Sequence, residues 1–118
     1  MKRILIAEDE EVLREVFKDE LAEEGYGVVE ARDAKGTLES LKKEKVDLLI
    51  LDIKLPDMSG LKLLEMIRKN YPALPIIVCT AYDSFKTDYE IWAGQIADYI
   101  VKPVDLEVLK EKIGKIIG

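Results

Sequence analysis

Two kinds of segment alternate along the whole chain in the pattern of hydrophobic and polar positions. Short runs that are apolar at most positions occupy residues 3–7, 26–31, 46–51, 75–81 and 96–101. Runs without strict alternation are typical of strands buried on both faces, as in a parallel sheet. The longer segments between and after these runs carry apolar residues every three or four positions, which is the spacing of one helix face.

The helical segments also contain start and stop signals. The first, residues 10–24, has one apolar face, and Gly25 follows where the helix should end. The residues of that face are Leu13, Val16, Phe17 and Leu21. Asp33 can cap the second helix, and Ser59 or Gly60 begins the third. Five strands alternating with helices predict an α/β fold with a parallel sheet, right-handed crossovers and helices on both faces.

Polar side chains gather at the predicted carboxyl ends of the strands. Glu8 and Asp9 follow the first run, and the central run leads directly into Asp52. Thr80 lies near the end of the fourth run, and Lys102 follows the fifth. In open α/β sheets these ends form the crevice that binds ligands. Taken singly, each residue has a plainer interpretation as a cap, a turn residue, a strand hydroxyl or a solvated lysine, but their convergence favours a functional site.

Composition narrows the range of functions. The 118 residues fit one domain, 1–118, and the net charge of −6 argues against a nucleic-acid-binding surface. The sequence has no histidine, which excludes histidine-based triads and metal sites and any phosphohistidine on this chain. A single cysteine, Cys79, suits a reducing cytosol, and no apolar run approaches membrane-spanning length. We therefore expect a cytoplasmic domain that binds neither nucleic acid nor membrane directly.

The residues at the strand ends suggest phosphoryl transfer. Carboxylates without histidine or cysteine ligands favour a hard cation, above all Mg²⁺. An ionised Asp52 is a nucleophile that can form an aspartyl phosphate. The positive charge of Lys102 and the hydroxyl of Thr80 can then neutralise and hold phosphoryl oxygens.

These residues and their spacing resemble the receiver domain of two-component response regulators. The matching motifs are Glu8-Asp9, Asp52-Ile-Lys-Leu-Pro56 with Gly60, Thr80-Ala81, and Tyr99 with Lys102-Pro103. The resemblance covers the whole chain. It implies a flavodoxin-like (βα)5 fold, in which five parallel strands have the order 2-1-3-4-5.

By this resemblance, Asp52 is the phosphoacceptor. Asp9 and Asp52 would bind Mg²⁺ directly, together with the backbone carbonyl of Lys54, while Glu8 would act through water. The family commonly has two aspartates after the first strand, and here Glu8 replaces the first of them. We expect its longer arm to preserve metal binding.

The resemblance also assigns roles to residues of the last two strands. Thr80 and Lys102 would hold the phosphoryl group, and Thr80 and Tyr99 would form a switch pair. Lys102-Pro103 would be a cis peptide bond. The switch would alter the face formed by the fourth helix, fifth strand and fifth helix, which a downstream target reads.

Two features of the fourth helix depart from the family or leave alternatives open. The family usually ends this helix with Gly-Ala, which aligns here with Gln95-Ile96, whereas Gly94 falls one place early. The end of the helix and the start of the fifth strand are therefore left open. The helix also carries an aromatic stripe: Phe85, Tyr89 and Trp92. Core packing is the first interpretation of the stripe, and an exposed patch on the signalling face is the alternative.

The expected function is that of a phosphoacceptor signalling domain that catalyses only its own aspartyl phosphorylation and dephosphorylation. Its phosphoryl group would come from a sensor histidine kinase or a histidine phosphotransfer protein, and the domain is either stand-alone or cut from a longer regulator. A flavin-binding flavodoxin-like protein is one alternative, but the acids 8–10 would repel a phosphate. A haloacid-dehalogenase-like phosphatase is another, but it needs an Asp-x-Asp pair, and Lys54 stands at the second position.

Two residues near the site bear on the lifetime of the phosphoryl group. Lys54 lies two positions after Asp52, and Tyr82 lies two positions after Thr80. In the family these positions are associated with the dephosphorylation rate, and a Lys/Tyr pair resembles long-lived phosphorelay receivers. A tyrosine ring would obstruct the attacking water, so we expect slow self-dephosphorylation and signal removal by a partner phosphatase or by back-transfer. The plainer interpretation is that both side chains point to solvent.

Overall fold

Five parallel strands form one sheet within residues 1–81 and 89–118, the part of the chain that the computed structural model describes. The strands are β1 (Arg3–Ala7), β2 (Gly27–Ala31), β3 (Leu48–Leu51), β4 (Ile76–Thr80) and β5 (Asp98–Val101). Their order across the sheet is β2-β1-β3-β4-β5, and each neighbouring pair is parallel. This order confirms the predicted flavodoxin-like fold.

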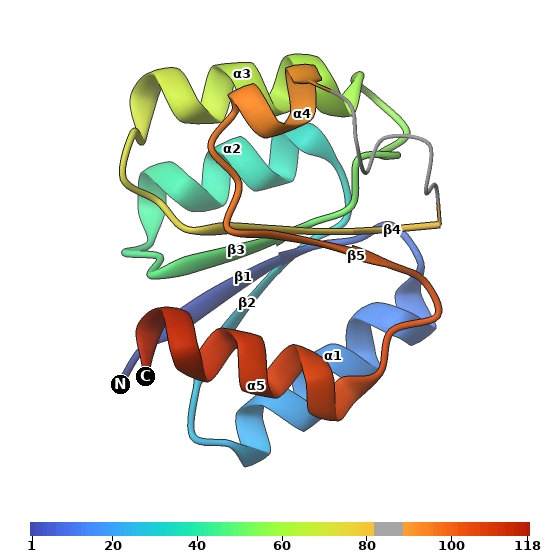
Figure 1. Ribbon diagram of the computed structural model, residues 1–118, viewed down its shortest axis with the longest axis vertical. Helices are drawn as coiled ribbons and strands as arrows, with labels where there is room; N and C mark the ends of the chain where they lie inside the picture. The colour runs from blue at the N-terminus through green and yellow to red at the C-terminus, as the bar shows by residue number, and fades with distance from the viewer. Residues whose placement is uncertain (82–88) are drawn as a thin grey trace.

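Helices cover both faces of the sheet (Figure 1). On one face lie α2 (Ala34–Lys43), α3 (Gly60–Asn70) and α4 (Tyr89–Ala93), and on the other lie α1 (Glu11–Glu23) and α5 (Leu106–Ile117). For residues 89 and 90 the structure describes the backbone only. The predictions made for Tyr82, for Phe85 and for the side chain of Tyr89 therefore lie outside the described residues.

Each face of the sheet packs against its own apolar core. Successive residues of a strand point to opposite faces. Leu5 and Leu49 therefore pack toward α2 and α3, whereas Ile4 and Ile50 pack toward α1 and α5. All four side chains are buried, and each contributes about 1.5–3 kcal/mol by leaving water. Burial on both faces explains why the strand runs lack strict alternation.

The signals at the ends of α1 and α2 are mostly confirmed. Gly25 ends α1 with a φ of 93°, a conformation that glycine adopts without steric cost. Asp33 caps α2, because its carboxylate accepts the N–H of Gly36 at 2.6 Å. Val16 is wrongly predicted to be inward, since it is exposed. The buried side of α1 is centred on Phe17, and Val16 lies at its margin.

The turn after α4 shows where this helix ends and where β5 begins, which the sequence had left open. Gln95 itself adopts the left-handed conformation, with a φ of 56°, at the position where the family has glycine. Arg68 of α3 holds this turn by donating from Nε to the carbonyl of Gly94 at 2.8 Å and from Nη2 to that of Gln95 at 3.3 Å. Gly94 is needed for close packing, because a Cβ there would lie 2.7 Å from Cδ2 of Leu64. β5 then begins at Asp98, two residues later than predicted.

The aromatic stripe is not wholly a core feature. Trp92 is 42% exposed, so core packing is the wrong interpretation for this ring. Ile91 is fully buried and fills the inward position, and the next residue of a helix is rotated by about 100° from it. Among the residues that the structure describes, no helix is both long and apolar enough to cross a membrane.

Candidate functional site

Backbone pairing carries the polar residues to one edge of the sheet. Asp52 donates its N–H to the carbonyl of Ala7 at 3.0 Å, and Lys102 donates its N–H to that of Thr80 at 2.8 Å. The hydrogen bonding between strands thus continues past their last residues into the loops that hold the polar side chains. Glu8 joins this edge because it follows β1, which lies between β2 and β3. Glu8, Asp52, Thr80 and Lys102 therefore lie at the same edge of the sheet, as predicted.

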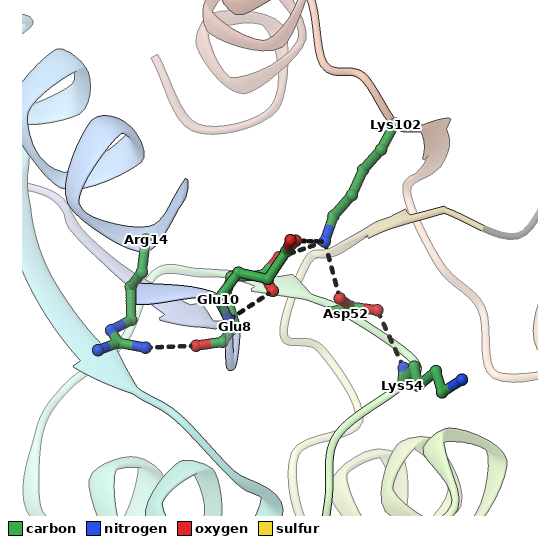
Figure 2. A network of polar contacts seen from close by, with 6 residues as sticks. All are labelled: Glu8, Glu10, Arg14, Asp52, Lys54 and Lys102. Carbon is green, nitrogen blue, oxygen red and sulfur yellow. Dashed lines mark hydrogen bonds and ion pairs between the residues drawn. The ribbon is translucent and has the colours of Figure 1, made fainter. Parts of the chain in front are cut away.

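The ammonium group of Lys102 is the centre of the site (Figure 2). Its Nζ lies 2.7 Å from Oε1 of Glu8, 2.9 Å from Oδ2 of Asp52 and 3.0 Å from Oε2 of Glu10. An ammonium has three N–H donors, and three carboxylates surround it. The peptide bond between Lys102 and Pro103 is cis.

Burial perturbs the titration of the groups in the site. The side chain of Glu8 is only 2% exposed, and burial raises its pKa to about 7, although hydrogen bonds from Lys102 and the Glu10 N–H oppose the shift. Burial disfavours the charged form of Lys102 as well. Its hydrogen bonds to Glu8, Asp52 and Glu10 outweigh that effect and raise the pKa of Lys102. The lysine therefore stays protonated, and the surplus charge of the site is negative.

Three carboxylates of the site are arranged so that they can share a metal ion. Oxygen atoms of Glu8, Asp9 and Asp52 all lie within 4.8 Å of one another. Glu8 and Asp52 are buried, whereas Asp9 is exposed. Oxygen ligands and surplus negative charge suit a hard divalent cation such as Mg²⁺.

The loop after β3 fixes the orientation of Asp52. The N–H of Lys54 donates to Oδ1 of Asp52 at 2.9 Å, and the Lys54 side chain extends away from that carboxylate (Figure 2). Lys54 and Ser59 form an isolated bridge across the loop. The loop closes tightly at Gly60, where a Cβ would lie 2.2 Å from the carbonyl oxygen of Ile53. These contacts hold both oxygens of Asp52, one from the loop and one from Lys102.

Thr80 and Tyr99 lie on the same face of the sheet. Tyr99 pairs with Val78, two residues before Thr80, and alternate residues of a strand share a face. Thr80 is fully buried, and among the described residues its Oγ1 has no hydrogen-bond partner. A buried hydroxyl without a partner costs about 1–3 kcal/mol, so this group calls for an acceptor that a ligand can supply. Tyr99 is buried.

Sequence reasoning did not single out three residues that support the site. Glu10 contacts Lys102, and Arg14 donates from Nη1 to the carbonyl of Glu8 at 2.7 Å. Asp57 accepts N–H groups of residues 34 and 35 at 2.8 and 3.0 Å, which lowers its pKa and ties the loop after β3 to the start of α2. In the sequence, Glu10 could have been noticed only as part of the acidic run at 8–11, and Asp57 only as a turn residue next to Pro56.

The parallel sheet and the polar residues at its carboxyl edge define a class of protein, the α/β domains that bind ligands at the carboxyl ends of parallel strands. Residues 4–114 match the family model of the response regulator receiver domain. The chain therefore belongs to the receiver-domain family of two-component response regulators, which confirms the resemblance seen in the sequence.

Known proteins of this family cover nearly the whole chain. It is 34% identical over 113 residues to the response regulator protein FleR of Pseudomonas aeruginosa, a match that covers 96% of this chain and 24% of FleR. It is 36% identical over 105 residues to the transcriptional regulatory protein PhoP of Escherichia coli, covering 89% of this chain and 47% of PhoP. The chain thus spans less than half the length of these curated relatives.

Solved structures agree in fold. The crystal structure of the response regulator protein TrrA of Thermotoga maritima, in complex with Mg²⁺-BeF, has a TM-score of 0.91 and 40% identity and covers 99% of this chain and 100% of that chain. A CheY-like response regulator receiver domain protein of Methanospirillum hungatei has a TM-score of 0.92 and 37% identity, covering 98% of this chain and 92% of that chain.

Proposed function

We propose that this chain, as a receiver domain over residues 1–118, accepts a phosphoryl group on Asp52 and thereby changes the surface that it presents to a partner. The observation that carries the proposal is the surroundings of Asp52, whose carboxylate contacts the ammonium of Lys102 and shares an oxygen cluster with Glu8 and Asp9. The buried Thr80, whose hydroxyl has no partner among the described residues, ends the neighbouring strand β4 at the same edge of the sheet. These groups supply a nucleophile, a positive charge, metal ligands and a hydrogen-bond donor at one edge of the sheet.

In the reaction, an ionised oxygen of Asp52 attacks the phosphorus of a phosphohistidine on a partner protein. The bond from phosphorus to the imidazole nitrogen breaks, and its electron pair leaves with the imidazole. The Lys54 N–H and Lys102 hold the carboxylate in place before attack. Lys102 and Thr80 then bind phosphoryl oxygens as their charge is redistributed.

Asp9, Asp52 and the backbone carbonyl of Lys54 would hold Mg²⁺ directly, and Glu8 would act through water; the oxygen cluster of Glu8, Asp9 and Asp52 supports this assignment. When bound, the ion supplies positive charge that neutralises phosphoryl oxygens. The TrrA structure in complex with Mg²⁺-BeF supports this part of the proposal, because that protein has the same fold and is 40% identical.

The proposed partners follow from the chemistry. A sensor histidine kinase or a histidine phosphotransfer protein donates the phosphoryl group, a phosphatase or back-transfer removes it, and a downstream target binds the face of α4, β5 and α5. Thr80 and Tyr99 form the proposed switch, in which phosphoryl oxygens draw the Thr80 hydroxyl toward Asp52 and Tyr99 rearranges in response. The proposed location is the cytoplasm, which suits the reduced, buried thiol of Cys79.

Mass spectrometry after incubation with acetyl phosphate and Mg²⁺ tests the central claim. The parent protein should gain one phosphoryl group, Asp52→Asn should gain none, and Asp9→Asn should be labelled more slowly because the metal is held less well. Asp19→Asn, at an exposed site on α1, is the matched control and should be labelled like the parent. Full labelling of Asp52→Asn would refute the assignment.

The switch is tested separately by NMR. Addition of beryllofluoride, which mimics a phosphoryl group, should shift amide signals along α4, β5 and α5 as well as in the pocket. Shifts confined to residues around Asp52 would mean that the domain only carries a phosphoryl group and does not signal through this face.

A further inference from the structure

The hydrogen-bonding capacity of Lys102 is already full before any phosphoryl group arrives. Its three N–H donors point at three carboxylates, those of Glu8, Glu10 and Asp52, at distances of 2.7–3.0 Å. A phosphoryl oxygen can therefore bind this ammonium only if one of the three carboxylates leaves it. Which carboxylate leaves is decided by burial and by what else holds each group.

Two of the three carboxylates are held in place. The side chains of Glu8 and Asp52 are 2% and 6% exposed. Glu8 also accepts the N–H of Glu10 at 3.1 Å, and Asp52 also accepts the N–H of Lys54 at 2.9 Å. Moving either carboxylate would leave a buried charge without its partner, which is costly.

Glu10 differs from both of them. Its side chain is 62% exposed, so water can solvate its carboxylate as soon as it leaves Lys102. Glu10 is the N-cap residue of α1, but its side chain makes no capping hydrogen bond. Moving this side chain away from Lys102 therefore breaks no hydrogen bond at the start of the helix. An ion pair whose carboxylate is this exposed to water contributes little free energy.

We propose that Glu10 is a placeholder for the phosphoryl group. In the unphosphorylated protein its carboxylate occupies the third donor of Lys102, and it turns into solvent when a phosphoryl oxygen takes that place. Glu10 acts through Lys102 and is a positioning residue. This inference rests on the proposed function, because it assumes that phosphoryl oxygens bind Lys102 next to Asp52.

As a placeholder, Glu10 competes with anionic ligands for the ammonium of Lys102. Glu10→Gln removes the competing charge and keeps the size of the side chain. At saturating Mg²⁺, its dissociation constant for beryllofluoride should fall about three- to five-fold, which corresponds to ~0.7–1 kcal/mol. The acetyl phosphate concentration that gives half-maximal labelling should fall by the same factor, while the maximal labelling rate changes little, because attack by Asp52 is unaltered.

Glu11→Gln is the matched control. Glu11 is exposed in the first turn of α1, and among the described residues the carboxylates that Lys102 contacts are those of Glu8, Glu10 and Asp52. The two substitutions remove the same charge at adjacent positions. A difference between their dissociation constants for beryllofluoride therefore points to the specific contact of Glu10 with Lys102. In 1 M salt the difference between them should shrink, because an exposed pair is screened.

Tighter beryllofluoride binding by Glu10→Gln than by Glu11→Gln supports the inference. Equal binding by the two variants, or weaker binding by Glu10→Gln, overturns the placeholder role of Glu10. The proposed function survives that result as long as the parent protein is still labelled on Asp52. Absence of labelling on Asp52 in the parent protein overturns the proposed function and this inference together.

Discussion

Two lysines of this protein each contact three carboxylates, yet only one of them lies in the candidate site. Lys102 contacts Glu8, Glu10 and Asp52, and Lys110 contacts Glu20, Glu24 and Glu107. The two lysine side chains are similarly sheltered, at 13% and 15% exposed. The difference lies in the acids. Glu8 and Asp52 are buried, whereas each acid around Lys110 is at least 32% exposed.

This comparison shows that the number of ion pairs does not mark a functional site. Exposed carboxylates such as those around Lys110 are satisfied by water, and their pairs with lysine contribute little. Buried carboxylates such as Glu8 and Asp52 depend on the cations near them, because water does not reach them. The candidate site thus holds buried acids and, among the described residues, an unpartnered hydroxyl at Thr80, whereas the cluster around Lys110 is a structural link between α1 and α5.

The comparison is tested most strongly by removing each lysine in turn. Lys102→Met should slow labelling by acetyl phosphate about 100-fold or more, because loss of one donor to transition-state charge has an effect of that size. Lys110→Met makes the same chemical change in the other cluster and should be labelled at the parent rate. Initial rates from mass spectrometry measure both. Equal slowing in the two variants would show that the effect is on the fold and not on the site.

The next largest expected effect is on the rate at which the phosphoryl group is lost. The Lys54 side chain extends away from Asp52 in the unphosphorylated protein (Figure 2), so its part in the proposed shielding requires it to turn toward the phosphoryl group. If it does so, and if the ring of Tyr82 obstructs the in-line water, replacing Lys54 by Asn and Tyr82 by Ala should speed loss of the phosphoryl group about ten-fold, or ~1.4 kcal/mol of barrier. Decay of the label after removal of the donor measures the rate. Lys42→Asn, on α2, is the control. If the double variant decays like the parent, the two side chains do not shield the phosphoryl group.

The buried acids should also make stability depend on pH in a characteristic direction. The folded protein raises the pKa of Glu8 to about 7, so between its ordinary value and pH 7 the folded state holds a proton that the unfolded chain has released. The stability of the metal-free protein should therefore be highest near pH 5 and should fall by about 1–3 kcal/mol as pH rises through 7. Urea unfolding in EDTA at pH 5, 6, 7 and 8 measures this fall.

Two controls separate this effect from the titration of other groups. Glu8→Gln should flatten the fall, whereas Glu20→Gln, in the cluster around Lys110, should leave it unchanged. Added Mg²⁺ should restore stability at pH 8, because an ion that binds only the folded state stabilises it by mass action. An unchanged fall in Glu8→Gln would show that another group is responsible.

Sequence alone predicted most of the fold because the strong local signals all pointed the same way. The apolar runs, Gly25 and Asp33 each specify structure through their own chemistry, and the strand ends had to meet at one edge once the strands were parallel. The positions of Asp52 and Lys102 followed from that argument, and their contact at 2.9 Å agrees with it.

The rest was not predictable because it depends on contacts between segments far apart in the chain. The bonds from Asp57 to the start of α2 link residues 22 or 23 positions apart, and the contact of Glu10 with Lys102 links residues 92 apart. Nothing in the local pattern distinguishes Glu10 from Glu11. The left-handed turn at Gln95 depends on Arg68 of another helix, and the exposure of Trp92 depends on which neighbour fills the core.

The smallest expected effect concerns the fold itself. Lys110→Met keeps the apolar stem of the side chain and removes a charge whose partners are exposed, so the midpoint of thermal unfolding should shift by about 3 °C or less. In 1 M NaCl the shift should disappear, because salt already screens exposed pairs. Glu111→Gln, which breaks an exposed pair with Lys115, gives the scale of such changes. A midpoint for Lys110→Met that falls much further than that of Glu111→Gln, and that stays low in salt, would contradict this expectation. That result would show that the cluster around Lys110 is required for folding. The two lysine clusters would then differ only in degree.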